Sequence, residues 1–263
     1  MPITFKRAGQ EAVTLENVSF KGVALDKVTF KRHGQEAVTV FEKATAMPVK
    51  GDIITLDSKQ YRVLKVNGTV AEVLCMYDAN SSIKFDTNSP YNNTYKGNNI
   101  DTYCNNTFYN SLSATMKSAI VDKTFMQDSW ARASSVPTQS HYTGKYSSST
   151  YYLTLANATF GTSITKHCYC ISVQDVLDYL EATTSMGTSD TTLTDTNIFQ
   201  MFWNATTSQS GNPIWLRSAD SSDSNIAFSV SGNGGYLIGN YVNGTLAARP
   251  AFQIDLTKIS WSK

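Results

Sequence analysis

Cys168 and Cys170, in the stretch HCYC, are the residues whose type and spacing come closest to a reactive site. Residues two apart in a strand point to the same face, so the two thiols would lie side by side. A thiol becomes a nucleophile where its surroundings lower its pKa, whereas apolar surroundings keep it inert. Both residues, like Cys75 and Cys104, sit within apolar patterns, and no C-x-x-C pair occurs. We therefore expect buried free thiols and synthesis in a reducing cytoplasm.

Other residue types with catalytic chemistry are spaced less favourably. The histidines lie far apart in the chain and give no familiar zinc spacing. Asp220 and Asp223 resemble the paired acids of a glycosidase, but two acids in a serine-rich turn are more typical of solvent-facing caps. The glycines of 232–235 precede a strand-like segment instead of a helix, which argues against a phosphate-binding loop. We predict no catalytic residue, no metal site and no cofactor, so the chain is not expected to be an enzyme.

Composition restricts the partners that the surface can attract. The 263 residues carry a formal net charge of +1, and only 16% of them are charged. This balance gives no basic footprint for nucleic acid and no acidic one for cationic partners. Surface polarity must come from Asn, Ser, Thr and Tyr, a mixture that antibody-like binding surfaces use. The start, MPITFKRAGQ, lacks an apolar signal region, and no run of eighteen apolar residues follows, so we predict neither a signal peptide nor membrane insertion.

The N-terminal part of the chain contains an internal repeat. ITFKRAGQEAVTL at 3–15 returns as VTFKRHGQEAVTV at 28–40, and alternating apolar and polar residues predict short strands and turns. Two such hairpin units enclose little core, so residues 1–47 should pack against a partner chain, symmetry mates or the larger domain. We interpret 1–47 as a β-rich attachment or assembly module, which would serve a homo-oligomer or virion assembly. A duplicated hairpin that decorates the main domain is the alternative.

Residues 48–263 have the pattern of one compact domain. Two strands are predicted, at 61–66 and 71–76, with Asn67-Gly68 as the tight turn between them. Helical spacing of apolar residues, a Ser113 cap and a capping box at Ser172–Asp175 predict four helices. Their expected ranges are 100–112, 113–120, 172–180 and 194–203.

One stretch of this domain is predicted to be irregular. Residues 132–152 are polar and rich in turn formers, which is typical of a long functional or disordered loop. Few helices, many short strands and a long irregular insert together predict the fold class α+β, with an extensive loop face.

The segment 215–252 has apolar, arginine-bearing ends and a middle of small, polar and turn-prone residues. Strands are predicted to start at IWLRSAD and to close with RPAFQIDL. Between them, alternation predicts Phe228 and Val230 facing the core while Ser229 and Ser231 face outward. The segment thus combines an apolar frame with side chains that are free to contact a ligand.

Arg217 and Arg249 mark the two ends of this segment. A guanidinium can bind an anionic ligand in a bidentate manner. Pairing inside the protein, with acids such as Asp220 or with loop carbonyls, is the interpretation we favour for both arginines.

A family resemblance emerges from five motifs in a fixed order: GNNIDTYCNNTFYNSLSATMKSAIV, YCISVQDVLDYL, IWLRSAD, AFSVSGNGG and ARPAFQIDL. Over about 51–260 the chain resembles C-type-lectin-like domains of the formylglycine-generating-enzyme type, a family common in gut bacteria and their phages. The family includes variable proteins that are diversified by retroelements. The resemblance implies a ligand-binding scaffold with a mutable C-terminal surface, carried on a phage tail or a bacterial cell surface. The resemblance also suggests, as an alternative, a cysteine nucleophile or a copper-like site, but the apolar surroundings of the thiols disfavour it.

The residues of the C-terminal segment are compatible with such diversification. These retroelements mutate template adenines, and an AAC or AAT codon cannot become a codon for Lys, Glu, Gln, Met or Trp. None of these five residues occurs from 219 to 248. Turn-rich strand connections are short of the same residues for structural reasons, which is the alternative explanation.

We therefore predict a non-catalytic protein that binds a host-surface protein or glycan. The alternatives are an enzyme on a formylglycine-generating-enzyme-like scaffold and a structural tail component. The aromatic residues are expected to dominate the binding energy. The expected ligand-binding residues are Asn225, Ile226, Ser229, Ser231, Gly235, Tyr236, Ile238, Gly239, Asn240, Tyr241, Asn243, Gly244 and Leu246.

Overall fold

The structure is a computed structural model, in which the chain forms two compact units, Met1–Met47 and Pro48–Lys263. In the larger unit the structure describes all residues except 136, 139, 147–148, 183–194, 205–210 and 233–234. In the smaller unit it describes residues 46–47 and a set of short strands.

The described strands of the smaller unit form three antiparallel hairpins. β1 pairs with β2, β3 with β4 and β5 with β6. Each copy of the sequence repeat therefore supplies one hairpin, and the predicted short strands are confirmed. The strand bounds are Ile3–Phe5 (β1), Val13–Leu15 (β2), Ser19–Phe20 (β3), Val23–Ala24 (β4), Lys27–Phe30 (β5) and Val38–Glu42 (β6).

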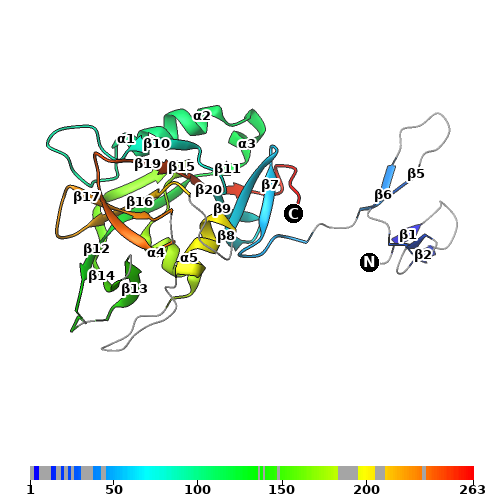
Figure 1. The fold of residues 1–263 in the computed structure, drawn as a ribbon. Helices are drawn as coiled ribbons and strands as arrows, with labels where there is room; N and C mark the ends of the chain where they lie inside the picture. The colour runs from blue at the N-terminus through cyan, green and yellow to red at the C-terminus, as the bar shows by residue number, and fades with distance from the viewer. Residues whose placement is uncertain are drawn as a thin grey trace. The chain divides into compact units, whose positions relative to one another are not determined.

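The larger unit contains a first sheet with the order β11-β20-β9-β8-β7, in which β15 also pairs with β20 (Figure 1). All of its pairings are antiparallel. Gly68, with a φ of 60°, lies in the turn between β8 and β9, as the Asn-Gly signal predicts. The bounds are Ile53–Leu56 (β7), Lys59–Asn67 (β8), Val70–Cys75 (β9), Ile120–Val121 (β11), Cys168–Tyr169 (β15) and Ala251–Asp255 (β20).

A second sheet has the order β10-β19-β16-β12-β14-β13, with β17 paired to β16 and β18 paired to β17. It is mixed, because β16 runs parallel to both β12 and β19. Its bounds are Asn80–Lys84 (β10), Lys123–Ala133 (β12), Tyr142–Tyr146 (β13), Ser149–Lys166 (β14), Ile214–Asp220 (β16), Ile226–Val230 (β17), Leu237–Tyr241 (β18) and Thr245–Ala248 (β19).

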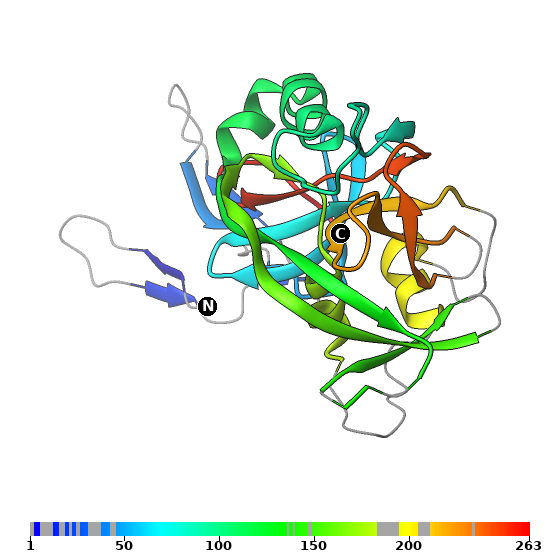
Figure 2. The same ribbon diagram turned by 90° about the vertical axis from the view of Figure 1, so that its left-hand side faces the viewer.

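Short helices flank the sheets, with the run from α1 to α3 on one side and α4 and α5 on another (Figures 1 and 2). The Ser113 side chain accepts a hydrogen bond from Met116 N, and Ser172 and Asp175 form the predicted capping box. The predicted helices are confirmed, with a π-helical turn inside the first run. Their bounds are Asn99–Thr102 (α1), Tyr103–Phe108 (η1), Tyr109–Ser111 (α2), Ala114–Ala119 (α3), Val173–Leu180 (α4) and Asp195–Trp203 (α5).

The predicted fold class, α+β with a C-type-lectin-like domain, is wrong. The described part is mostly β, with antiparallel and mixed sheets and few helices. A principal reason is the stretch 132–152, predicted as a loop, most of which belongs to the strands β12, β13 and β14. Its Tyr, Thr and Ser residues are polar enough to suggest a loop, yet Tyr and Thr favour strands. The polar composition of this stretch therefore predicted a loop where the structure has antiparallel strands.

Aromatic side chains fill the core of the larger unit. The rings of Phe85 and Trp215 lie 5.4 Å apart, and those of Tyr61 and Phe252 lie 5.3 Å apart. Trp215 is fully buried, and its Nε1 donates to the carbonyl of Ile83 over 2.8 Å. This residue therefore joins the start of β16 to the edge strand β10.

Replacing Trp215 by alanine should lower the free energy of unfolding by about 3–5 kcal/mol, because a large cavity forms beside Phe85. The matched control is Tyr241→Ala, which truncates an aromatic residue of the same segment that is 65% exposed. Its expected effect is within about 0.5 kcal/mol. Urea unfolding followed by circular dichroism measures the free energy of unfolding of both variants. Equal losses would contradict the conclusion that Trp215 belongs to the buried apolar frame and Tyr241 to the surface.

Candidate functional site

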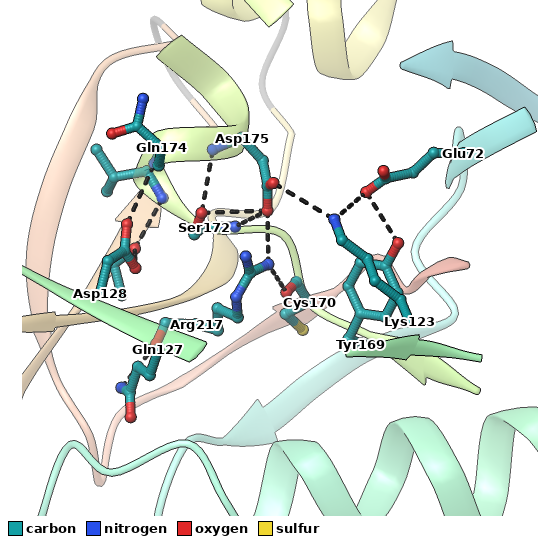
Figure 3. Close-up of polar contacts among 12 residues, drawn as sticks. Glu72, Lys123, Gln127, Asp128, Tyr169, Cys170, Ser172, Gln174, Asp175 and Arg217 are labelled. Atoms are coloured by element: carbon teal, nitrogen blue, oxygen red, sulfur yellow. Dashed lines mark hydrogen bonds and ion pairs between the residues drawn. The ribbon is translucent and has the colours of Figure 1, made fainter. Parts of the chain in front are cut away.

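An ion pair between buried Arg217 and half-buried Asp175 fixes the first end of the C-terminal segment (Figure 3). Arg217 of β16 is 4% exposed, and its Nη1 donates to Asp175 Oδ2 over 2.6 Å and to the carbonyl of Cys170 over 2.9 Å. Its guanidinium also lies over the Phe125 ring, 4.5 Å from the centroid. Burial alone would raise the pKa of Asp175, but the charges of Arg217 and Lys123 outweigh it and hold that pKa well below its usual range.

Lys123 also pairs with a second carboxylate, that of Glu72. Lys123 Nζ lies 2.7 Å from Glu72 Oε1 and 3.6 Å from Asp175 Oδ1. The Tyr169 hydroxyl donates to Glu72 Oε1 over 2.8 Å. Burial, and then the nearby carboxylates, raise the pKa of Tyr169, so its hydroxyl keeps its proton and remains a donor. Charges of opposite sign therefore alternate along the chain of contacts from Glu72 to Arg217 (Figure 3).

A third carboxylate, that of Asp128, connects the start of α4 to strand β16. Asp128 Oδ1 accepts from the Ser218 hydroxyl over 2.5 Å, and its Oδ2 accepts from Trp130 Nε1 over 2.7 Å. The Ser218 hydroxyl in turn accepts from the backbone nitrogen of Val173 over 2.7 Å. The start of α4, β12 and β16 are thus held by one set of buried hydrogen bonds.

Arg249 fixes the other end of the segment in a similar way. Its Nε donates to Asp78 Oδ1 over 2.7 Å, its Nη1 donates to the carbonyl of Phe202, and its guanidinium lies over the Trp203 ring. The prediction that both arginines pair inside the protein is confirmed. Their partners are Asp175 and Asp78, however, because Asp220 pairs with another arginine of the second sheet.

The predicted ligand-binding residues divide by exposure into three groups. Three are exposed: Asn225, Tyr241 and Asn243. Seven are half-buried: Ile226, Tyr236, Ile238, Gly239, Asn240, Gly244 and Leu246. Three are buried: Ser229, Ser231 and Gly235. The segment is therefore more deeply embedded in the fold than its composition suggests.

The expectation that Ser229 and Ser231 face outward is wrong. Strand β17 lies between β16 and β18, and Ala227, Phe228 and Ser229 are all fully buried along it. The Ser229 hydroxyl accepts from Asn240 Nδ2 over 2.6 Å. A serine can occupy an interior position when a neighbouring strand supplies its hydrogen bond, and alternation alone does not reveal such a partner.

Gly239 also belongs to the frame. A Cβ at this position would lie 2.7 Å from Ile226 Cγ2 and 2.8 Å from Arg132 Cζ. Arg132 cannot withdraw easily, because its Nε donates to Asp220 Oδ2 over 2.9 Å. Gly235 has a φ of 69°, a conformation that favours glycine. A side chain would be crowded at Gly239 and would strain the backbone at Gly235.

The structure brings together Asn225, Ile226, Tyr241 and Asn243, which we name the turn patch. Ile226 pairs with Tyr241 across β17 and β18, and Val242 N donates to the carbonyl of Asn225 over 2.9 Å. Most of the other predicted residues lie elsewhere on the hairpin of β17 and β18. Ser231 N donates to the carbonyl of Tyr236 over 2.8 Å, at the opposite end of the same strand pair, while Leu246 lies on β19.

The cysteines are core residues, as predicted. All four are free and buried, and Cys104 Sγ lies 3.9 Å from Cys170 Sγ. Burial raises the pKa of Cys75 and of Cys168, so these thiols stay protonated. His167, beside Cys168 in sequence, pairs with Asp122 and stacks on an aromatic ring instead of approaching a thiol. Within the described ranges no group of three His, Cys, Asp or Glu residues is arranged to hold a metal ion.

Sequence reasoning missed two cavities and one positioning residue. A cavity of about 840 Å³ exposes Glu72, Lys123 and Asp175, and a neighbouring one of about 410 Å³ is lined by Arg62. The third feature is Asn93, whose buried Nδ2 donates to the carbonyls of Asp220 over 2.9 Å and Ile226 over 2.8 Å. These residues come from segments far apart in the chain, so no local motif identifies them.

Comparison with known proteins places the chain in a family. Residues 70–256 match the family described as a domain of unknown function, DUF6273, and the chain belongs to this family. No curated protein and no solved structure matches the chain. Among the residues that the structure describes, no helix is long and apolar enough to cross a membrane.

Replacing Asp175 by asparagine should lower the free energy of unfolding by about 3–5 kcal/mol at neutral pH, because Arg217 keeps its buried charge without a carboxylate. The folded-state pKa of Asp175 lies below the unfolded value of about 3.9. Its contribution is therefore full above that value and is lost as the pH falls below it. Urea titrations from pH 7 to pH 2 should show a smaller loss of stability on acidification in the variant.

The control for Asp175 is Asp178→Asn, an exposed acid of the same helix, with an expected effect within about 0.5 kcal/mol. An Asp175→Asn variant as stable as this control would show that the ion pair does not hold β16.

Replacing Gly239 by serine should cost about 1–3 kcal/mol, because the new Cβ must displace Ile226 or Arg132. The comparison is Asn243→Ser, which places the same side chain at an exposed position and should be neutral. Chemical denaturation of both variants measures the difference. Equal stability would mean that Gly239 is a free surface position after all.

Proposed function

We propose that this protein is a non-catalytic binding protein that contacts its ligand through the turn patch. The observation that carries the proposal is Tyr241, an aromatic residue 65% exposed at the edge of a segment whose two ends are fixed by ion pairs of buried arginines with half-buried aspartates. Exposed tyrosine beside asparagine is the combination that binding loops use, since it offers a rigid apolar ring and adaptable hydrogen bonds.

Preorganisation supports the proposal. Val242 is buried between the exposed Tyr241 and Asn243, and its carbonyl accepts from Asp86 N over 3.0 Å. Asn93 holds the preceding turn by its contacts with the carbonyls of Asp220 and Ile226. A ligand would therefore meet a backbone that is already ordered, and little of the binding energy would be lost in fixing it.

The chemistry of the patch favours a neutral ligand surface. None of its four side chains is charged, so long-range electrostatic attraction contributes little to association. A tyrosine ring can stack on the apolar face of a sugar or enter an apolar pocket of a protein, while asparagine amides bind hydroxyls or carbonyls. We propose a host-surface protein or glycan as the ligand.

Retroelement diversification, in this proposal, is limited to exposed positions. Asn225, Tyr241 and Asn243 can change without disturbing a described contact of the core. Ser229 and Gly239 belong to the frame, because the first hydrogen-bonds inside the sheet and the second has no room for a Cβ. Related chains should accordingly differ at the first group and agree at the second.

Tyr241→Ala should weaken ligand binding by about 30-fold, which corresponds to the roughly 2 kcal/mol typical of an aromatic anchor. The wild-type chain is first screened on an array of neutral glycans and host-surface ectodomains, and the best ligand is then titrated by biolayer interferometry. Leu155→Ala, an apolar residue of β14 that is 38% exposed, is the control and should bind as the wild type does. A wild type without any ligand on the array, or a Tyr241→Ala variant with full affinity, would overturn the proposal.

A further inference from the structure

The smaller cavity, of about 410 Å³, lies beside β8 and the C-terminal ends of α4 and α5. Arg62 of β8 forms part of its wall, together with Lys50, Glu181, Gln200 and Asn204. None of these residues belongs to the turn patch. The cavity has the size of a site for a single small molecule.

Arg62 is a buried cation that no carboxylate pairs with in the part of the chain that the structure describes. The described part of the chain buries Arg62, Arg217 and Arg249, and the latter two pair with aspartates. Arg62 is 6% exposed, and among the described residues it has no ion pair. A buried charge of this kind is costly unless a counter-charge accompanies it.

The donors of Arg62 are only partly used. Its Nη1 donates to the carbonyl of Gly51 over 2.8 Å and its Nη2 to Asn204 Oδ1 over 3.0 Å. Its Nε has no hydrogen-bond partner among the described residues. A guanidinium offers five N–H donors, and the second hydrogens of Nη1 and Nη2 remain for an oxygen acceptor in the cavity, while Nε is itself fully buried.

The remaining charges of the wall cancel. Lys50 Nζ pairs with Glu181 at the rim, where both side chains are largely open to solvent. Arg62 therefore leaves the described wall with a net charge of +1. Gln200 and Asn204, one helical turn apart on α5 and just beyond it, add amide groups that bind hydroxyls.

The helix ends help to select the kind of anion. α4 and α5 both end at this cavity, and the C-terminal end of a helix carries a partial negative charge. This partial negative charge disfavours a doubly charged phosphate more than a single carboxylate. A single carboxylate on a polyhydroxylated molecule matches this wall better, because it neutralises the one unbalanced positive charge of the described wall, that of the Arg62 guanidinium.

We infer that this cavity binds the carboxylate of a hydroxylated small molecule, an acidic monosaccharide in chemical class. Arg62 pairs with the carboxylate, while Gln200 and Asn204 bind hydroxyl groups of the ring. The inference is independent of the proposed function of the turn patch, and it gives the larger unit a second binding site.

The test is isothermal titration calorimetry of the full chain with D-glucuronate, with D-glucose and inorganic phosphate as comparison probes. The wild type should bind glucuronate at least tenfold more tightly than either comparison probe. Arg62→Gln should weaken glucuronate binding at least tenfold, whereas Tyr241→Ala should leave it unchanged and so separate this site from the turn patch.

A second variant decides the question if Arg62→Gln does not fold. Gln200→Glu places a carboxylate on the same wall, where it can pair with Arg62 and replace that of the ligand. This variant should raise the melting temperature and abolish glucuronate binding, while Gln200→Ala should retain binding reduced only a few-fold. Absence of glucuronate binding by the wild type, stronger binding of phosphate, or unchanged glucuronate binding in Gln200→Glu would overturn the inference.

Discussion

The ion pair between Arg217 and Asp175 is the contact on which the arrangement of the larger unit depends. It joins β16 of the second sheet to α4, and through Lys123 it continues to Glu72 on β9 of the first sheet. A buried ion pair adds little net stability compared with well-packed apolar residues, but the loss of one partner leaves a buried charge. The network therefore acts chiefly on specificity, because alternative packings of the two sheets would separate its charges.

Anchoring at both ends explains how the C-terminal segment can combine a fixed backbone with a changeable surface. Arg217 and Arg249 hold its limits, and Asn93 holds the turn before β17. Substitutions at Asn225 or Asn243 touch none of these contacts. The free energy of folding and the chemistry of the turn patch are thus carried by different residues, which a binding protein needs if its surface is to change without loss of the fold.

Local signals predicted what is determined locally. The capping residues Ser113 and Ser172, the Asn67-Gly68 turn and the repeated hairpins all appear where the sequence places them, because their hydrogen bonds lie within a few residues. Long-range contacts escaped prediction. Part of the strand character of 132–152 depends on the pairing of β12 with β14, the burial of Ser229 depends on Asn240, and the partner of Arg217 comes from helix α4. Periodicity and composition contain no information about these partners.

The two proposed sites differ in their electrostatics, and this difference makes them separable in solution. The turn patch is neutral, so salt should change its affinity little, whereas screening weakens an exposed charge pair. At the cavity, Arg62 lies in a buried and only partly solvated position, where an ion pair is stronger and less screened than at the surface. A carboxylate bound there should therefore respond to salt less than an anion held by surface lysines would, but more than a ligand of the turn patch. The order of these three salt dependences follows from burial and charge alone. The salt dependence of an observed binding activity therefore assigns that activity to one of the two sites before any residue is changed.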